Sequence, residues 1–331
     1  MTSINYFSNK VILITGGSGS FGTYATKRLL TLNPKEIRIF SRDAKKQKIL
    51  AKKISNDPKV KFFIGNIQDL RKLYNAAKKV DLIIHAAANK FIDLCQEDPV
   101  GAIATNVIGT QNVIESALKN KVKFVINLSA DKAVYPTGVY GATKQLSENL
   151  IITASKQSTG TVFVNLRYSN VIGSSGSVVE IFRERLAKDQ TIEIFDSRAE
   201  RLILTQADVW RLLEKAINKA RGGEIFAYLA PKTSILKIAK VLRQQEGSGK
   251  IKVNKRLREG EKLGATLISN EEAPRTSILS NKIAVICPTL DAKISGYYTK
   301  FARKFGKEYY SMENAPEIKL ESLEKMLSMI E

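Results

Sequence analysis

The sequence predicts an α/β protein of the Rossmann type, in which a doubly wound parallel sheet is followed by a smaller α/β lobe. Short apolar runs without polar alternation recur through the first half, a pattern typical of strands buried on both faces. Segments with helical spacing of apolar residues separate these runs. This alternation of strand and helix indicates parallel strands joined by crossover helices.

The expected elements follow from this pattern in chain order. The strands expected in the sheet are residues 11–15, 37–40, 60–64, 81–85, 122–128 and 161–167, and a helix is expected over 102–120. Beyond residue 170 we expect a loop at 170–177, a helix at 178–189, strands at 191–195 and 224–230, and a terminal amphipathic helix at 320–330. Residues 1–170 should thus form a Rossmann domain with the catalytic residues. Residues 171–331 should form mainly a substrate lobe, from which the chain crosses back to the first sheet.

The charge balance is basic, with 53 Lys and Arg against 32 Asp and Glu among 331 residues and a net charge of +21. Such a charge suits nucleic acid, a membrane surface or a small anion as partner. The lysines are scattered, without a concentrated basic arm, so we expect an anionic substrate and no nucleic acid.

Targeting and metal signals are weak. No run of about 20 apolar residues predicts a membrane-spanning helix, and the N-terminus leads into a first strand rather than a signal peptide. Cys95 and Cys287 lack CxxC spacing and fit a reducing cytoplasm. His85 is the only histidine and lies in an apolar run, so we expect it to be buried. Neither a metal site nor a Ser/His/Asp triad is expected.

A glycine-rich turn, TGGSGSFG, joins the first strand to a helix. Gly16, Gly19 and Gly22 permit a tight turn and a close approach of backbone N–H groups to a pyrophosphate at the helix N-terminus. This predicts a nicotinamide dinucleotide site, with Ser18, Ser20 and Phe21 as further contacts from the same turn.

The end of the second strand bears on the choice of cofactor. Ser41, Arg42 and Lys45 follow this strand, and a guanidinium pairs well with a 2′-phosphate. NADP is therefore expected, although Asp43 leaves NAD open as the less favoured cofactor. Asn66 would bind the adenine edge or cap a loop. The remaining expected contacts are Ile67, Ala86, Ala87, Ala88 and Asn106.

Tyr140 and Lys144 are spaced i, i+4, so one helix face presents both. An ammonium nearby favours the phenolate and lowers the tyrosine pKa, which makes Tyr140 usable as a base. Alone, this pair would be read as an ordinary surface pair. Downstream of a glycine turn it is typical of short-chain dehydrogenases.

The chain resembles an extended short-chain dehydrogenase/reductase of the nucleotide-sugar branch. Within that branch it is most similar to the UDP-N-acetylglucosamine 4,6-dehydratases of polysaccharide biosynthesis. The segments that carry the resemblance, in family order, are TGGSGSFG, FSRD, HAAANK, TNVIGTQNVI, SADKAVYPTGVYGATK, RYSNVIGSSGSVV, FDSRAERL, REGEKL and YYSMENAP. Tyr140, in place of the methionine of some relatives, resembles the subgroup that also inverts C5.

The resemblance implies roles for four catalytic residues. Tyr140, assisted by Lys144, would remove the C4 hydroxyl proton of a UDP-sugar. Lys132 would then remove the C5 proton, and Asp131 would protonate the departing C6 hydroxyl. The resemblance also implies a homo-oligomer. The substrate-binding residues that it implies are Lys90, Asn170, Arg201, Arg258 and Glu261, each of which could instead be a solvated surface residue.

Several positions depart from the family pattern. Ala130 stands where a hydroxyl normally contacts the reacting sugar oxygen, and Ser169, Ser175, Gly264 and Ala265 replace other usual residues. Two alternatives therefore remain. One is a UDP-sugar 4-epimerase or reductase of the same fold, which needs no Asp131/Lys132 pair. The other is a catalytically impaired cofactor-binding or nucleic-acid-binding protein, which Ala130 and the net charge favour.

Overall fold

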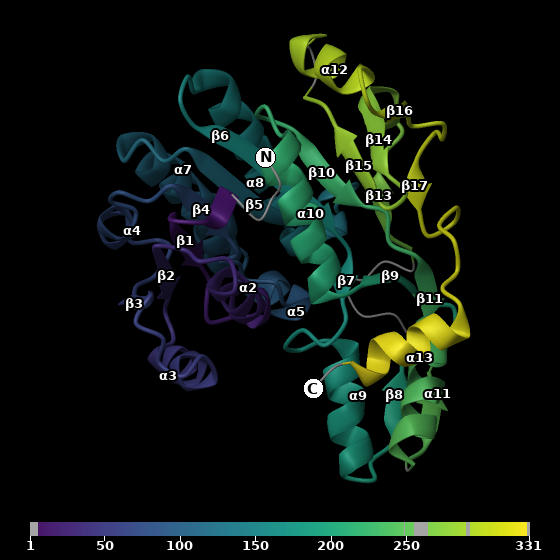
Figure 1. The fold of residues 1–331 in the computed structure, drawn as a ribbon. Helices are drawn as coiled ribbons and strands as arrows, with labels where there is room; N and C mark the ends of the chain where they lie inside the picture. Colours follow the sequence, from purple (N-terminus) through teal and green to yellow (C-terminus); the bar gives the residue numbers. More distant parts are fainter. Residues whose placement is uncertain (1–5, 248, 255–263, 289–291, 330–331) are drawn as a thin grey trace.

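The structure, a computed structural model, describes residues 6–247, 249–254, 264–288 and 292–329. A ten-stranded sheet lies at its centre in the order β16-β14-β15-β10-β6-β5-β4-β1-β2-β3 (Figure 1). The seven strands from β10 to β3 are parallel to their neighbours, and β15, β14 and β16 join antiparallel. The predicted doubly wound α/β fold is confirmed.

All six strands expected in the first half are present. They are β1 (Val11–Thr15), β2 (Glu36–Ser41), β3 (Val60–Ile64), β4 (Leu82–His85), β5 (Phe124–Ala130) and β6 (Val162–Tyr168). Every residue of β1 and β4 is buried. This burial on both faces explains why their sequences are continuous apolar runs.

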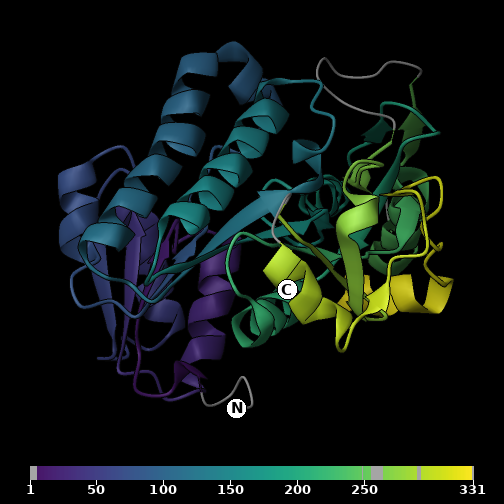
Figure 2. The same cartoon turned by 90° about the horizontal axis from the view of Figure 1, so that it is seen from above.

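Helices cover both faces of the sheet, as the views in Figures 1 and 2 show together. One face packs against α4 (Leu70–Ala76), α7 (Gly109–Lys119) and α8 (Val139–Gln157). The other packs against α2 (Ser20–Leu30) and α10 (Gln206–Lys219). Further helices of the first half are α3 (Ala44–Lys53), α5 (Ile92–Glu97) and α6 (Pro99–Ile103). None of the helices in the described ranges has the length and apolar character needed to cross a membrane.

The helix expected over 102–120 is interrupted. Between α6 and α7, residues Ala104–Ile108 form a π-helical segment, η1, in which Thr105 and Asn106 are buried. A side chain at Gly109 would place its Cβ 2.7 Å from Ile67. Segments of this kind occur often at functional sites, and this one faces α8, the helix that carries Tyr140 and Lys144.

The chain after residue 170 contributes to two parts of the molecule. It supplies β10 (Ile225–Tyr228), β14 (Thr276–Ser280), β15 (Ile283–Ile286) and β16 (Arg303–Lys304) to the central sheet, and α12 (Ala292–Thr299) beside it. It also forms a smaller lobe with its own core, which includes Phe182, Leu242 and Leu323. The lobe comprises α9 (Val178–Ala187), β8 (Ile192–Ile194), β9 (Glu200–Leu204), β11 (Lys232–Ser234), α11 (Ile235–Glu246), β12 (Ile251–Val253) and α13 (Leu320–Ser328).

Short elements connect these parts. They are β7 (Asn170–Val171), β13 (Thr266–Ile268), the 3₁₀ turn η3 (Ala273–Arg275) and β17 (Tyr310–Ser311). β7 pairs with β9, and β13 pairs with β17.

A buried ionic cluster joins the catalytic helix to the late part of the chain. Arg167 on β6 binds Glu148 of α8 at 2.6 Å and Glu272 at 2.7 Å. It also donates to the carbonyl of Leu267 at 3.0 Å. The Arg167 side chain is 3% exposed, so loss of one carboxylate would leave a buried, undercompensated charge. The cluster fixes α8 against the segment that follows β13.

Candidate active site

A cavity of about 760 Å³ lies between the sheet and the lobe. Its lining includes residues that follow the carboxyl ends of β1, β2, β4, β5 and β6, and residues of α9, β8 and β9. In open α/β sheets, ligands bind outside the carboxyl ends of the strands. The cavity is therefore where the predicted site residues should lie.

The glycine turn lines the cavity beneath the N-terminus of α2. Gly16 has φ +64°, and a Cβ there would lie 2.7 Å from the backbone of Ala87. A Cβ on Gly22 would lie 2.4 Å from Gly17, so the helix packs on the turn itself rather than on the strand. The partner in that contact is Gly17, a residue that the sequence pattern did not predict to be part of the site. Gly19 caps α2 without a side-chain hydrogen bond, which leaves the first N–H groups available to an anion.

The end of β2 forms the next part of the lining. Ser41 Oγ accepts hydrogen bonds from Ser18 Oγ at 2.9 Å and from Gln47 Nε2 at 3.0 Å. Asp43 caps α3 by accepting from the backbone of Lys46 at 2.9 Å. Arg42, Asp43 and Lys46 all line the cavity. This places two exposed cations beside one carboxylate that already serves a helix.

Three residues expected to contact the cofactor are not part of the lining that the structure describes: Lys45, Asn66 and Asn106. The neighbouring Lys46 takes the place expected for Lys45. Asn66 accepts from Gln68 N at 3.2 Å and so caps its own loop, the alternative function expected for it.

Asn106 has a supporting position behind the lining. Its Oδ1 accepts from Asn89 N at 2.8 Å, and its Nδ2 donates to Asn89 O and Thr143 Oγ1. It therefore joins the loop after β4, which places Ala86 to Ala88 against the cavity, to the catalytic helix α8.

Asp131 and Lys132 follow β5 in the 3₁₀ turn η2 (Asp131–Ala133). Lys132 Nζ lies 2.9 Å from Asp131 Oδ1; the side chains are 27% and 1% exposed. Asp131 Oδ2 is buried, and no hydrogen bond to it is found within the described structure. Ser129 Oγ, also in the cavity lining, is likewise buried and without such a bond. Buried polar atoms of this kind are suited to a polar ligand.

Tyr140 and Lys144 lie in the first turns of α8 and line the same cavity. Lys144 Nζ donates to the carbonyl of Leu128 at 2.6 Å. Burial lowers the pKa of Lys144 to about 8, against the opposing effect of Glu148. Lys144 is thus protonated but close to its titration range at neutral pH.

The expected lowering of the Tyr140 pKa is not found. Burial, followed by the nearby Tyr168, Asp131 and Cys95, raises the pKa of this phenol. The reason is that desolvation disfavours the phenolate, while the ammonium of Lys144 is held on a main-chain carbonyl. The i, i+4 spacing nevertheless brings both groups to one wall of the cavity, as expected.

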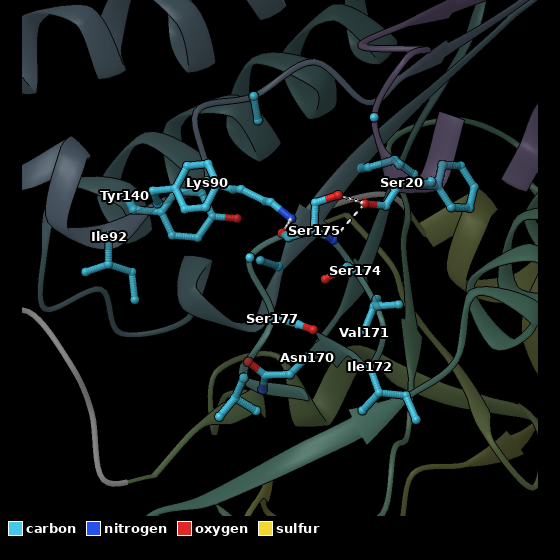
Figure 3. A pocket seen from close by; sticks show the side chains of 18 of the residues that line it. Ser20, Lys90, Ile92, Tyr140, Asn170, Val171, Ile172, Ser174, Ser175 and Ser177 are labelled. Atoms are coloured by element: carbon cyan, nitrogen blue, oxygen red, sulfur yellow. Dashed lines mark hydrogen bonds between the residues drawn. The ribbon is translucent and has the colours of Figure 1, made fainter. Parts of the chain in front are cut away.

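Lys90 and Ser175 meet where the lobe approaches the glycine turn (Figure 3). Lys90 Nζ donates to the carbonyl of Ser175 at 2.7 Å. Ser175 N donates to Ser20 Oγ at 2.9 Å, and the two hydroxyls lie 3.1 Å apart. These contacts join the loop between β7 and α9 to α2. Lys90, expected to bind substrate, is engaged by this loop, a contact that its sequence position does not reveal.

Asn170 and Arg201 line both this cavity and a smaller adjoining one of about 130 Å³. Asn170 donates to Leu202 O at 3.2 Å, and Arg201 to Glu200 O at 2.7 Å. The lining of the smaller cavity also includes Asp131, Lys132 and Tyr140, together with Gly264 and Ala265. Arg258 and Glu261 lie outside the residues that the structure describes.

The fold and the Tyr140/Lys144 geometry together define a Rossmann-fold protein of the short-chain dehydrogenase/reductase class. The model of a family described as "Polysaccharide biosynthesis protein" matches residues 12–287. A UDP-glucose 4-epimerase of Rickettsia felis is 36% identical over 328 residues, which cover 97% of this chain and 96% of that protein. The corresponding protein of Rickettsia canadensis is 35% identical over 329 residues, with 97% and 96% covered.

Solved structures agree with this placement. Pen from Bacillus thuringiensis superposes with a TM-score of 0.89 at 30% identity, and 98% of each chain is covered. A dTDP-glucose 4,6-dehydratase, DesIV from Streptomyces venezuelae, has a TM-score of 0.71 at 21% identity, with 76% of this chain and 86% of that chain covered. The chain belongs to the polysaccharide biosynthesis protein family of extended short-chain dehydrogenases/reductases, whose members modify nucleotide sugars.

Proposed function

We propose that the protein is an NADP-dependent UDP-sugar 4,6-dehydratase that acts on UDP-N-acetylglucosamine and inverts C5. The observation that carries this proposal is the Asp131–Lys132 ion pair at the end of β5, in the same cavity as Tyr140. An adjacent acid and base are what elimination of water across neighbouring carbons requires, and oxidation at C4 alone does not need them.

The residues at the cavity fit a nicotinamide dinucleotide. The N-terminus of α2, where the N-cap Gly19 makes no side-chain hydrogen bond, suits its pyrophosphate, and Arg42 and Lys46 suit a 2′-phosphate. When bound, the nicotinamide ring would accept a hydride from sugar C4 and later return it to C6. The side chains of the protein would position the sugar and transfer the protons.

Three proton transfers with the sugar, and one between two side chains, follow from the residues present. Tyr140 in its phenolate form, whose negative charge the Lys144 ammonium would stabilise, would take the proton of the C4 hydroxyl and become a neutral phenol. The ketone then acidifies the C5 proton. One proton passing from Lys132 to Asp131 within their ion pair would make a neutral amine, which is a base for C5, and a neutral carboxylic acid, which protonates the C6 hydroxyl as it leaves. Asp131 Oδ2, which is buried and has no hydrogen-bond partner among the described residues, is available for that hydroxyl.

The preference for NADP predicts a graded set of effects at the end of β2. Arg42→Asp should weaken NADP at least ~10-fold, the loss of a charge-assisted bond, and leave NAD within about 3-fold. Lys46→Ala should weaken NADP more than Lys45→Ala, because only Lys46 of these two lines the cavity. Titration calorimetry with both cofactors measures this. Equal loss of NAD and NADP in Arg42→Asp would remove Arg42 from the phosphate site.

A 4-epimerase is the second candidate, because the relatives at 35–36% identity carry that name. It would use Tyr140, Lys144 and the same cofactor without elimination. UDP binding would be shared by both functions, and we assign the diphosphate to Arg201 because it lines both cavities beside the catalytic residues.

The products separate the two functions. The purified protein should convert UDP-N-acetylglucosamine to a species lighter by one water, with solvent deuterium at C5 when the reaction runs in D₂O. Mass spectrometry and proton NMR of a panel of UDP-sugars measure both. A product of unchanged mass and inverted C4 would establish the epimerase instead. A lighter 4-keto product without deuterium at C5 would contradict the steps assigned to Lys132 and Asp131.

A further inference from the structure

We infer that His85 is a positioning residue that couples the cofactor side of the cavity to the catalytic helix α8 through a chain of hydrogen bonds of fixed direction. His85 is the last residue of β4, is buried and is the sole histidine of the chain. The proposed proton transfers do not use it. The inference rests on the proposed function only in naming α8 as catalytic.

Both ring nitrogens of His85 have a hydroxyl partner. Nδ1 lies 2.7 Å from Thr15 Oγ1, at the end of β1, and Nε2 lies 3.2 Å from Thr110 Oγ1 on α7. Burial, with Lys144 nearby, lowers the pKa of His85 to about 3, so the ring is neutral. A neutral imidazole carries one proton, and its hydroxyl partners decide on which nitrogen.

Thr110 decides the tautomer. Its single hydroxyl proton is donated to the carbonyl of Asn106 at 2.7 Å, since a carbonyl can only accept. Thr110 Oγ1 must therefore accept from His85 Nε2, which places the ring proton there. Nδ1 is then an acceptor, and Thr15 must donate to it. Thr15 Oγ1 in turn accepts from Ala87 N at 3.4 Å, in the loop that lines the cavity.

The same reasoning continues into α8. Thr110 Oγ1 lies 3.0 Å from Ser147 Oγ and has no proton left, so Ser147 donates to it. Ser147 Oγ accepts from Asn127 Nδ2, which also donates to Asn165 Oδ1, and Asn165 Nδ2 donates to Glu148 O. Ser147 lies one helical turn beyond Lys144. The series of hydrogen bonds thus runs from the cavity loop at Ala87 to the turn of α8 next to Lys144.

The hydrogen-bond chain through His85 has two branches, one towards Thr15 and one towards Thr110. Its two branches meet at the imidazole, so a change of tautomer or a lost nitrogen would release one branch and leave the other intact. The Thr15 branch supports the cofactor side, through the loop at Ala87. The Thr110 branch supports the catalytic side, through Ser147. The two branches should therefore affect different kinetic quantities.

A single histidine makes the tautomer directly measurable. In ¹⁵N-labelled protein, two-bond ¹H–¹⁵N spectra should show one imidazole, protonated at Nε2, unprotonated at Nδ1 and neutral down to pH 5. An Nδ1–H tautomer or an imidazolium at pH 5 would overturn the inference. The spectrum needs no sugar, so it decides this point whether or not the dehydratase proposal holds.

Two amide variants separate the branches. In the variant His85→Asn, the introduced amide Oδ1 can replace the ring Nδ1 towards Thr15. In His85→Gln, the introduced amide Nε2 can replace the ring Nε2 towards Thr110. His85→Asn should lower kcat about 2- to 10-fold, the effect of one hydrogen bond, with cofactor affinity unchanged. His85→Gln should weaken the cofactor by a similar factor with kcat kept. Calorimetry measures the affinity, and turnover uses whichever UDP-sugar the wild type accepts.

A merely structural role would give a different result. If both variants lowered Tm while kcat and cofactor affinity stayed at wild-type values, His85 would only support the sheet and the inference would fail. It would also fail if each variant changed kcat and cofactor affinity by the same factor, because the two branches would then not be separable.

Discussion

Replacement of Tyr140 by phenylalanine should lower turnover about 10³-fold, within the range that a positioned acid–base group contributes. The phenol oxygen is the group at the cavity wall assigned to the C4 hydroxyl proton, and the ring alone cannot accept a proton. Binding of the cofactor and of UDP should remain within about 3-fold, because the aromatic ring and its packing stay. Stopped-flow absorbance in the reduced-nicotinamide band measures C4 oxidation directly.

Tyr168 provides the matched control. It lines the same cavity from the end of β6, and burial raises its pKa as it does that of Tyr140. Tyr168→Phe removes an equally buried hydroxyl without removing the proposed base, so C4 oxidation should fall less than about 10-fold. Similar losses in the two variants would mean that Tyr140 acts through packing or polarity, and the assignment of the base would be wrong.

Replacement of Lys132 by alanine should stop elimination and leave C4 oxidation in place. The variant should form bound reduced cofactor on addition of UDP-N-acetylglucosamine, while release of the dehydrated product falls about 10²- to 10⁴-fold. The reason is the order of the steps, since Tyr140 and Lys144 act before the C5 proton is removed. Absorbance follows the first half of the reaction, and mass spectrometry follows the second.

Lys123 is a suitable control for this variant. It precedes the first residue of β5, at the end of the strand opposite to Lys132, and is exposed. Lys123→Ala changes the net charge equally but should leave both half-reactions unaltered. Dehydration at the wild-type rate in Lys132→Ala would refute the proposed base. Continued inversion at C4 in that variant would support the epimerase.

Local patterns predicted the sheet because each strand carries its own signal. Burial on both faces requires an apolar run wherever β1 or β4 lies in the sheet, so the run is visible without knowledge of the partners. The i, i+4 spacing of Tyr140 and Lys144 is equally local. The structure brings both to the cavity for this reason.

Contacts between distant segments could not be predicted in the same way. Whether Lys45 or Lys46 faces the cavity depends on the rotation of α3, which Asp43 sets by its cap. Asn106 binds the backbone of Asn89 rather than lining the cavity, because it lies in the π-helical segment, which directs its side chain to that loop. The raised pKa of Tyr140 results first from burial and then from the electrostatic effect of groups remote in sequence, including Tyr168. Each of these depends on packing, which no short window of sequence contains.

The buried cluster around Arg167 constrains the order in which parts of the protein can reach their final structure during synthesis. Glu148 and Arg167 are only 19 residues apart and are synthesised close together in time. Glu272 follows 105 residues after Arg167. β10, the neighbour of β6 in the sheet, also comes later than both. Until those segments are synthesised, the nascent first half has an open sheet edge at β6 and a guanidinium without its second carboxylate. The catalytic helix therefore gains its full support late in synthesis, and a chain that stops before Glu272 would keep every proposed catalytic side chain yet lack the carboxylate that completes the cluster behind them.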